Sequence, residues 1–290
     1  QALGQKFLLS FWGQERLPED FLPVVRHVQP AGFTLYRSLN LAHPGQVRTL
    51  TAGLQHIAHQ LGLPPFLIAV DQEGGQLLAI GENATAFPGN LALGAAGSED
   101  LARRIGAAIG RELAAMGINI NYAPVCDLLT NPRNTSLGTR AFSDDPALTA
   151  RLASAMIAGL QSVGVAATAK HFPGYGEVTT DAHFATPVLP HGLERLRQVE
   201  LPPFAAAIKA GVKLVMTGHQ ALPALEDGLD LPATLSRRLL GEVLRGAPSG
   251  AHEMGYTGLV VTDALDMGAI QQGDGLLLDC LAAFAAGVDL

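Results

Sequence analysis

Short runs of apolar residues recur along the chain, and most are separated by a segment with apolar residues at helical spacing. Each run is unbroken and does not alternate with polar residues, which is typical of strands that are buried on both faces of a parallel sheet. We therefore predict eight strands, within residues 7–11, 32–36, 65–70, 118–125, 163–169, 212–216, 258–262 and 288–290.

Helix signals lie between these runs. Ser98 is a good N-cap residue, because acidic residues and then an apolar stripe follow it. The segment Ser143-Asp144-Asp145-Pro146 marks another helix start, with proline at the first helical position. Further helices are predicted over residues 44–61, 193–199, 204–211, 235–244 and 276–286.

Strand and helix alternation repeated about eight times over roughly 250 residues has the size and order of a (β/α)₈ barrel. We therefore predict an α/β fold of the TIM-barrel type, in which residues 1–290 form a single domain. The alternative is a doubly wound open sheet, but the glycine-rich phosphate loop expected after its first strand is not found. The eighth predicted strand has only three residues, 288–290, so we expect a chain that is truncated in or after that strand.

Composition narrows the classes of partner. The formal net charge is −7 and no basic block occurs, which disfavours nucleic acid and anionic membrane surfaces. Cys126 and Cys280 are far apart in sequence, and we expect two buried thiols and no disulfide framework. No stretch resembles a membrane span or a signal peptide. We expect a cytoplasmic monomer, although the chain begins at Gln1 and not at Met.

Polar residues follow five of the predicted strands at the point where each strand ends. In a barrel these positions share the C-terminal rim, where active sites lie. Each residue alone has an ordinary explanation, such as a helix cap for Asp127 or a structural role for His219. The occurrence of polar residues at the ends of five strands favours a functional site at this rim. The residues are Asp71, Asp127, Lys170 with His171, His219 and Asp263.

Two of the elements have the residue types that catalysis needs. Asp263 directly follows a predicted strand, so a rigid strand end would hold its carboxylate, as a nucleophile requires. Asp181 and His183 are two residues apart on a loop, and an extended backbone would point both side chains the same way. Asp181 could then fix the tautomer of His183. One fixed carboxylate and one proton donor are the minimum for cleaving an acetal with retention.

These residues resemble the motifs of glycoside hydrolase family 3, and in particular its bacterial β-N-acetylglucosaminidase branch. The long signature Lys-His-Phe-Pro-Gly-x-Gly followed by Asp-x-His is present at Lys170–Gly176 and Asp181–His183. The resemblance extends over nearly the whole chain. Shorter family motifs are matched at Val70–Gly75, Ala123–Asp127, Arg140–Pro146, Met216–His219, Pro232–Ser236 and Val261–Leu265.

The resemblance implies a single barrel domain that works without a metal or cofactor, through a covalent glycosyl-enzyme and with retention. Asp263 then matches the nucleophile, His183 the acid/base residue and Asp181 its partner. The implied substrate is a terminal β-linked N-acetylglucosamine on a cell-wall fragment, as in peptidoglycan recycling. The residues matching the family's ligands of the sugar hydroxyls are Asp71, Arg140, Lys170 and His171, and we place His219 with them.

Three positions depart from the family pattern. Ala79 stands where the family often has Arg, which removes one expected contact to the sugar or the leaving group. Tyr175 replaces the more usual His between two glycines, and Ala182 replaces Ser or Thr within Asp-x-His. The last two changes leave Asp181 and His183 in place, so we expect activity with an altered substrate preference.

Other functions stay open at this point. Within the same family, the chain could be a β-glucosidase or a sugar-binding homologue with impaired catalysis. Lys170 at a strand end could instead form a Schiff base, as in an aldolase-type lyase. Imidazole and carboxylate groups also suit several divalent ions. The residues of such a metal site would be His171, Asp181, His183, His219 and Asp263.

Overall fold

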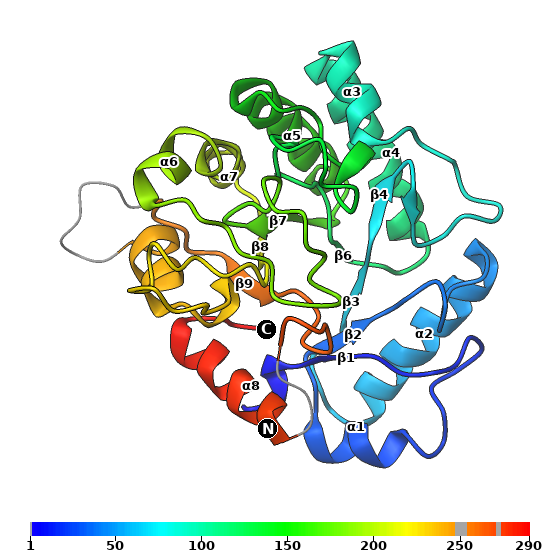
Figure 1. Cartoon of the computed structure of the whole chain (residues 1–290). Coiled ribbons are helices and arrows are strands. Elements are labelled where there is room, and N and C mark those ends of the chain that lie inside the picture. The colour runs from blue at the N-terminus through cyan, green and yellow to red at the C-terminus, as the bar shows by residue number, and fades with distance from the viewer. Residues whose placement is uncertain (1, 247–253, 271–273) are drawn as a thin grey trace.

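The structure is a computed structural model that describes residues 2–246, 254–270 and 274–290. Its centre is a curled sheet of seven parallel strands, with helices packed around the outside (Figure 1). Neighbours in the sheet follow one another in sequence, which is the order expected of repeated strand–helix units. The strands, in sheet order, are β1 (Leu8–Leu9), β2 (Gly32–Thr34), β3 (Leu67–Val70), β6 (Ile120–Asn121), β7 (Ala166–Phe172), β8 (Leu214–Thr217) and β9 (Leu259–Thr262).

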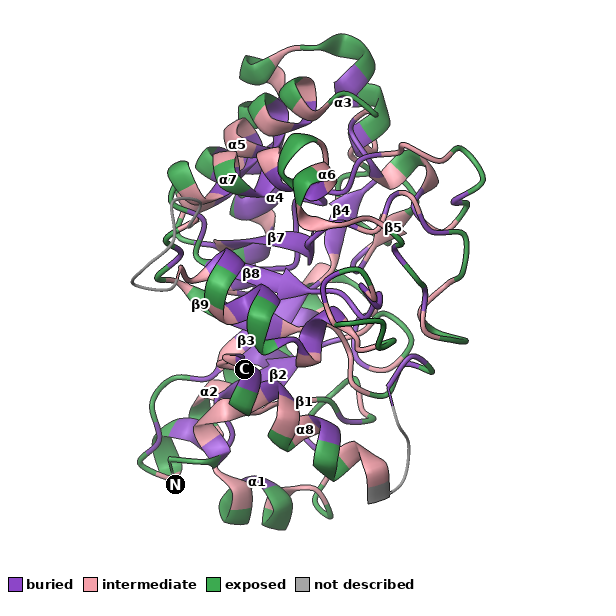
Figure 2. Cartoon of the chain, turned by 60° about the vertical axis from the view of Figure 1, so that its left-hand side comes forward, coloured by how far each residue is buried: buried purple, intermediate pink, exposed green. Residues whose placement is uncertain are grey.

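The α-helices lie mainly between consecutive strands and bury one face against the sheet, as the purple inner surfaces of Figure 2 show. Their apolar stripes and the outer face of the sheet form the main hydrophobic core. The helices are α1 (Leu22–Val28), α2 (Pro44–Gln60), α3 (Asn90–Ala96), α4 (Glu99–Ala115), α5 (Pro146–Gln161), α6 (Leu193–Gln198), α7 (Leu201–Lys209) and α8 (Asp274–Ala286).

The inner face of the sheet holds a second, smaller apolar cluster. Residues from different strands meet there, so the sheet curls around a packed interior and not around an open pore. Tyr122 reaches across this interior, and its hydroxyl is hydrogen-bonded to that of Thr34 at 2.9 Å. The cluster comprises Ala69, Ile120, Tyr122, Leu214, Met216 and Val261, with Leu8, Leu67, Ala166 and Leu290 packed against it.

Both helix starts singled out in the sequence are confirmed. Ser98 caps α4 by accepting a hydrogen bond from the backbone N–H of Leu101. Asp145 caps α5, with Pro146 at the first helical position. These caps fix where each helix begins, because they satisfy amides that have no partner inside the helix.

Several predicted boundaries are wrong. The helix predicted over 235–244 is a 3₁₀ turn, η3 (Ala233–Leu235), followed by a π-helix, η4 (Arg238–Leu244). Pro202 and Pro203 lie in the first turn of α7 and do not precede it, because proline fits the first turn of a helix. Several short elements were not predicted: α1, α3, the antiparallel pair β4 (Gln72–Gly74) and β5 (Leu77–Leu78), and the 3₁₀ turns η1 (Gly4–Lys6) and η2 (Gly138–Arg140).

The eighth predicted strand, at residues 288–290, is not assigned as a strand among the described residues. Its backbone nevertheless lies beside β9, because the N–H of Leu290 donates to Val260 O at 3.1 Å and that of Thr262 donates to Leu290 O at 3.1 Å. The observed fold is therefore a curled parallel α/β sheet of seven strands. None of the helices within the described ranges combines the length and apolar character that crossing a membrane requires.

Candidate active site

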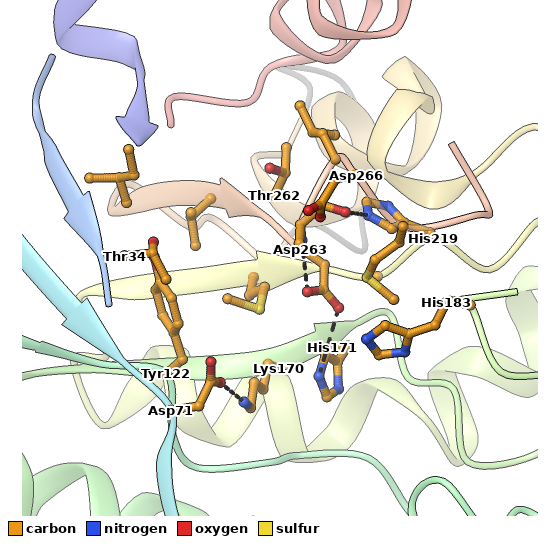
Figure 3. Close-up of a pocket in the computed structure, with 18 of the residues that line it drawn as sticks. Thr34, Asp71, Tyr122, Lys170, His171, His183, His219, Thr262, Asp263 and Asp266 are labelled. Atoms are coloured by element: carbon orange, nitrogen blue, oxygen red, sulfur yellow. Dashed lines mark hydrogen bonds and ion pairs between the residues drawn. The ribbon is translucent and has the colours of Figure 1, made fainter. Parts of the chain in front are cut away.

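A cavity of about 920 Å³ lies at the C-terminal ends of the strands. The structure brings the predicted site residues together there, although they come from widely separated parts of the chain, and only Asp127 lies outside the lining, beneath His171. This is the outcome expected when parallel strands end at one edge. Figure 3 labels six of the predicted residues, Asp71, Lys170, His171, His183, His219 and Asp263. The predicted residues that line the cavity are Asp71, Arg140, Lys170, His171, Asp181, His183, His219 and Asp263.

Lys170, Arg140 and Asp71 line one wall of the cavity, and the carboxylate of Glu73 lies buried behind them. Lys170 Nζ lies 2.6 Å from Asp71 Oδ1 and 2.6 Å from Glu73 Oε1. Arg140 contacts Glu73 at two points, with Nη2 2.8 Å from Oε1 and Nε 2.9 Å from Oε2. Such two-point contacts are among the strongest polar interactions in proteins. Glu73 is almost fully buried, whereas the Asp71 side chain is 28% exposed and faces the cavity.

This wall has a defined charge state. Burial by itself raises the pKa of Glu73, but Lys170 and Arg140 together outweigh it and bring that pKa down to about 2. Burial likewise lowers the pKa of Lys170, but Asp71 and Glu73 reverse the effect and raise it above its ordinary value. Lys170 is therefore an ammonium ion. A Schiff base requires a neutral amine, so these contacts argue against the lyase alternative.

His171 is oriented by a carboxylate beneath the cavity. Its Nδ1 lies 2.7 Å from Asp127 Oδ2. The Asp127 carboxylate is fully buried and also accepts hydrogen bonds from the backbone N–H groups of His171 and Tyr175. Because an ionised carboxylate can only accept, the Nδ1 atom carries the proton. The other nitrogen of His171, Nε2, points into the cavity and lies 4.0 Å from Asp263 Oδ2.

Asp263 stands at the end of β9, as its sequence context predicts. Its backbone N–H donates to Thr217 O at 3.0 Å, and its Oδ1 accepts from the backbone N–H of Ala264 at 2.8 Å. Burial raises the pKa of this carboxyl, but the imidazoles of His171 and His219 and the Ala264 N–H lower it below its ordinary value. The carboxylate is therefore ionised at neutral pH and open to the cavity.

His219 lines the cavity, but protein groups occupy both of its ring nitrogens. Nε2 lies 3.0 Å from the carbonyl oxygen of Ala264, and Nδ1 lies 2.8 Å from the hydroxyl of Thr234. A carbonyl only accepts, so Nε2 carries a proton. Burial lowers the pKa of this imidazole. The ring is thereby tied to the backbone directly after Asp263.

Asp181 and His183 form a pair on the loop that crosses the cavity mouth. Asp181 Oδ1 lies 2.7 Å from His183 Nδ1 and also accepts from the His183 backbone N–H at 2.9 Å. Burial raises the pKa of Asp181, but the two hydrogen bonds from His183 lower it overall. The proton is thus on Nδ1, and Nε2 is left for chemistry. The imidazole reaches from the loop towards Asp263 and His171 (Figure 3).

The three departures from the family pattern lie in different surroundings. Tyr175 lines the cavity, with its ring edge-on to that of His171 and its hydroxyl 3.5 Å from Arg140 Nη1. Ala182 lines the cavity beside the Asp–His pair. Ala79 is buried in the main hydrophobic core and is not part of the cavity wall.

Some residues of the site were missed or undervalued in the sequence. Glu73 is not among the site residues predicted from the sequence, yet it joins the two cations that line the cavity. Tyr36 is the last residue of a predicted strand, and this position could have indicated its place in the wall. Tyr122 and Met216 gave no signal, because an apolar strand residue pointing into the interior looks like any other core residue.

The metal-site alternative finds no support in the geometry. Within the ranges 2–246, 254–270 and 275–290, no three or more His, Cys, Asp or Glu side chains are arranged to hold a metal ion. His219 has both nitrogens engaged, and the Nδ1 atoms of His171 and His183 are each engaged by a carboxylate.

Known proteins resemble this chain over its whole length. "Beta-hexosaminidase A" of Pseudoalteromonas piscicida is 34% identical over 100% of this chain and 52% of its own length. "Beta-hexosaminidase" of Pseudomonas aeruginosa is 36% identical over 92% of this chain and 76% of its own. The solved structure of a glycoside hydrolase family 3 β-N-acetylglucosaminidase from Paenibacillus sp. str. FPU-7 is 43% identical and superposes with a TM-score of 0.94, over 100% of this chain and 53% of that protein.

The chain thus spans about half the length of two of these three proteins and about three quarters of the other. A family model, the glycosyl hydrolase family 3 N-terminal domain, matches residues 13–290. The resemblance seen in the sequence motifs is confirmed by these comparisons. The chain belongs to glycoside hydrolase family 3 and corresponds to the N-terminal domain of that family.

Proposed function

We propose that residues 1–290 form the catalytic domain of a retaining glycosidase that removes terminal β-linked N-acetylglucosamine from glycans. One observation carries the proposal: an ionised strand-end carboxylate, Asp263, and a carboxylate-oriented imidazole, His183, line the same cavity, whose volume of about 920 Å³ is ample for a sugar and part of its leaving group. The names of the family relatives, β-hexosaminidase and β-N-acetylglucosaminidase, support the choice of sugar.

In the first step, an oxygen of Asp263 attacks the anomeric carbon as the bond to the leaving oxygen breaks. His183 donates a proton to that oxygen, so the leaving group departs as a neutral alcohol and the sugar remains as an ester on Asp263. In the second step, His183 takes a proton from water, which attacks the anomeric carbon and frees the carboxylate. Two inversions at one carbon give overall retention.

The Asp181–His183 contact supports the acid/base assignment. A carboxylate on Nδ1 fixes the tautomer and stabilises the imidazolium between proton transfers, so Nε2 alone exchanges protons with the substrate. The imidazole side chain is 68% exposed, which leaves room for a leaving group of considerable size beside it.

The charged wall provides the groups for binding sugar hydroxyls. Asp71 has a second carboxylate oxygen towards the cavity, and His171 presents Nε2 there. Lys170 and Arg140 line the cavity as cations whose donors are partly occupied by Glu73. In a site shielded from water, hydrogen bonds from charged groups to hydroxyls are strong and directional. His219 contributes to the wall chiefly by holding the backbone after Asp263.

We further propose that the sheet closes as a (β/α)₈ barrel, with residues 288–290 as the start of the eighth strand. The hydrogen bonds of Leu290 with Val260 and Thr262 support this. Packing of Leu290 and Leu8 against the same interior cluster supports it as well. The contact between Phe7 and Phe284, with ring centroids 5.7 Å apart, holds α8 next to the N-terminal segment.

Release of p-nitrophenol from the β-N-acetylglucosaminide and the β-glucoside, compared side by side, tests the proposal. The expected result is preference for the N-acetyl sugar, with turnover abolished in Asp263→Asn. Turnover of the glucoside alone would place the protein in the β-glucosidase branch of the family. Turnover of neither sugar, with binding of N-acetylglucosamine retained, would favour a binding homologue.

A further inference from the structure

The loop that carries His183 is hydrogen-bonded, through its backbone, to the segment that follows Asp263. The N–H of Gly268 donates to His183 O at 3.1 Å, and the N–H of Ala269 donates to Ala182 O at 3.0 Å. Two consecutive carbonyl groups of the loop are therefore held by two consecutive amides of the other segment.

A side chain adds a third bond between the same two segments. The hydroxyl of Thr186 donates to Ala269 O at 3.1 Å. The loop has little packing of its own at this point, because His183, Phe184 and Ala185 are all exposed, with 83% of Phe184 accessible. Segments with few buried contacts open readily unless they are tied down. These three bonds therefore tie the loop, directly beside His183, to the segment that follows Asp263.

The receiving segment is itself well anchored. Met267, Ala269 and Ile270 are buried. The Met267 N–H donates to Ala264 O at 3.2 Å, the carbonyl that His219 also holds. Two consecutive hydrogen-bonded turns, 264–267 and 267–270, thus connect the nucleophile to the segment that holds the loop.

The close approach of the two segments depends on a glycine. A Cβ atom on Gly268 would lie 2.6 Å from His183 O and 3.0 Å from the carbonyl carbon of Phe184. Real Cβ atoms do not approach backbone atoms so closely, so one segment would have to move away. The φ angle of Gly268 lies outside the left-handed region, so the requirement is for space and not for an unusual backbone conformation.

We infer that Gly268 is a positioning residue, which lets the segment after the nucleophile hold the acid/base loop at a fixed distance from Asp263. The inference rests on the proposed glycosidase function. It adds that direct backbone contact sets the positions of Asp263 and His183 relative to each other before any substrate binds. This positioning in advance matters because a displacement of a reacting group by about 1 Å can slow a reaction roughly 100-fold.

The test compares two β-N-acetylglucosaminides in the variant Gly268→Ala. One has a 2,4-dinitrophenol leaving group, which departs without a proton, and the other has an alkyl leaving group, which needs one. Displacing His183 should lower kcat/KM for the alkyl glycoside at least about 10-fold, because general acid catalysis contributes about 10²–10⁴-fold. The dinitrophenyl glycoside should change less than about 2-fold in kcat/KM. Its kcat should fall where the second step, which needs His183 as a base, limits turnover, and azide should restore that kcat because it attacks without a base.

Gly53→Ala is the matched control, because a Cβ at Gly53 would meet nothing within 4 Å. It should leave both substrates unchanged. A purely structural defect in Gly268→Ala would lower kcat/KM for both glycosides in equal proportion, and that result, like no effect on either, would overturn the inference. Failure of the proposed function looks different, because the wild type would then cleave neither glycoside.

Amide hydrogen exchange provides a readout that needs no substrate. Exchange at residues 268 and 269 should accelerate at least about 10-fold in Gly268→Ala relative to Gly53→Ala, since local opening exposes these amides. If Gly268→Ala does not fold, Thr186→Val decides the matter, because it removes one of the three bonds without adding bulk to the backbone. It should show the same selective loss for the alkyl glycoside, of about 2–5-fold, and an unchanged ratio of the two substrates would overturn the inference.

Discussion

Replacing Glu73 by Gln tests whether the buried charged wall is built as described. The substitution keeps the shape of the side chain but removes the negative charge between Lys170 and Arg140. Two cations would then share a buried site with Asp71 as the remaining carboxylate of the wall. Removing one partner of a buried ion pair typically costs about 3–5 kcal/mol of the free energy of unfolding.

The pKa of Glu73 gives a second value for the part of the free energy of unfolding that depends on its charge. A decrease from 4.5 to about 2 on folding corresponds to about 3 kcal/mol of stability, at about 1.4 kcal/mol per pKa unit. Because the folded pKa is the lower one, this contribution is complete above pH 4.5 and is lost as the pH falls towards 2. Protonated Glu73 resembles Gln, so the deficit of the variant should shrink in acid.

Urea unfolding at pH 7 and pH 3.5 measures both effects. We expect Glu73→Gln to lose about 3 kcal/mol at pH 7, and the deficit to be smaller by about 1 kcal/mol at pH 3.5. The matched control is Glu99→Gln, which breaks the exposed pair between Glu99 and Arg151, 3.0 Å apart, and should cost no more than about 1 kcal/mol. Equal losses in the two variants, or a deficit for Glu73→Gln that is independent of pH, would refute the reasoning.

Three further substitutions test other contacts of the site. Asp127→Asn should lower the free energy of unfolding by about 1–3 kcal/mol in urea titrations, and also lower kcat, because an amide cannot accept from His171 and two backbone N–H groups at once. Tyr175→Phe should change the free energy of unfolding by less than about 0.5 kcal/mol, because the nearest partners of the hydroxyl are 3.4 Å or more away. Asp181→Asn should slow alkyl glycosides about 100-fold and spare dinitrophenyl glycosides in kcat/KM measurements, because His183 loses the carboxylate that orients it. A loss in Asp181→Asn that is the same for both leaving groups would contradict its role.

Much of the fold and site follows from local patterns in the sequence. Continuous apolar runs identified the strands, because strands covered on both faces need apolar residues throughout. The rule that parallel strands end at one edge then brought together polar residues as distant as Asp71 and Asp263. The helix starts at Ser98 and Asp145 could be predicted because a capping side chain accepts hydrogen bonds from backbone N–H groups only two or three residues further along the chain.

Other features depend on contacts between distant segments and have no local signature. That Glu73 joins both cations depends on the β4–β5 hairpin, which the sequence did not reveal. The hydrogen bonds at the two ring nitrogens of His219 depend on where the segments carrying Thr234 and Ala264 run. The bond between Gly268 and the acid/base loop is made by backbone atoms, so its only trace in the sequence is a glycine, which has many other uses.

The most direct test of the central claim is to identify the residue that becomes bonded to the sugar. A 5-fluoro β-N-acetylglucosaminyl fluoride should trap the intermediate, because fluorine on the ring destabilises the oxocarbenium-like transition state of both steps while the fluoride leaving group keeps the first step feasible. Peptide mapping by mass spectrometry should then find the sugar on Asp263 in the wild type and on no residue in Asp263→Asn. A sugar attached to any other residue, or turnover of the N-acetylglucosaminide that survives in Asp263→Asn, would contradict the account.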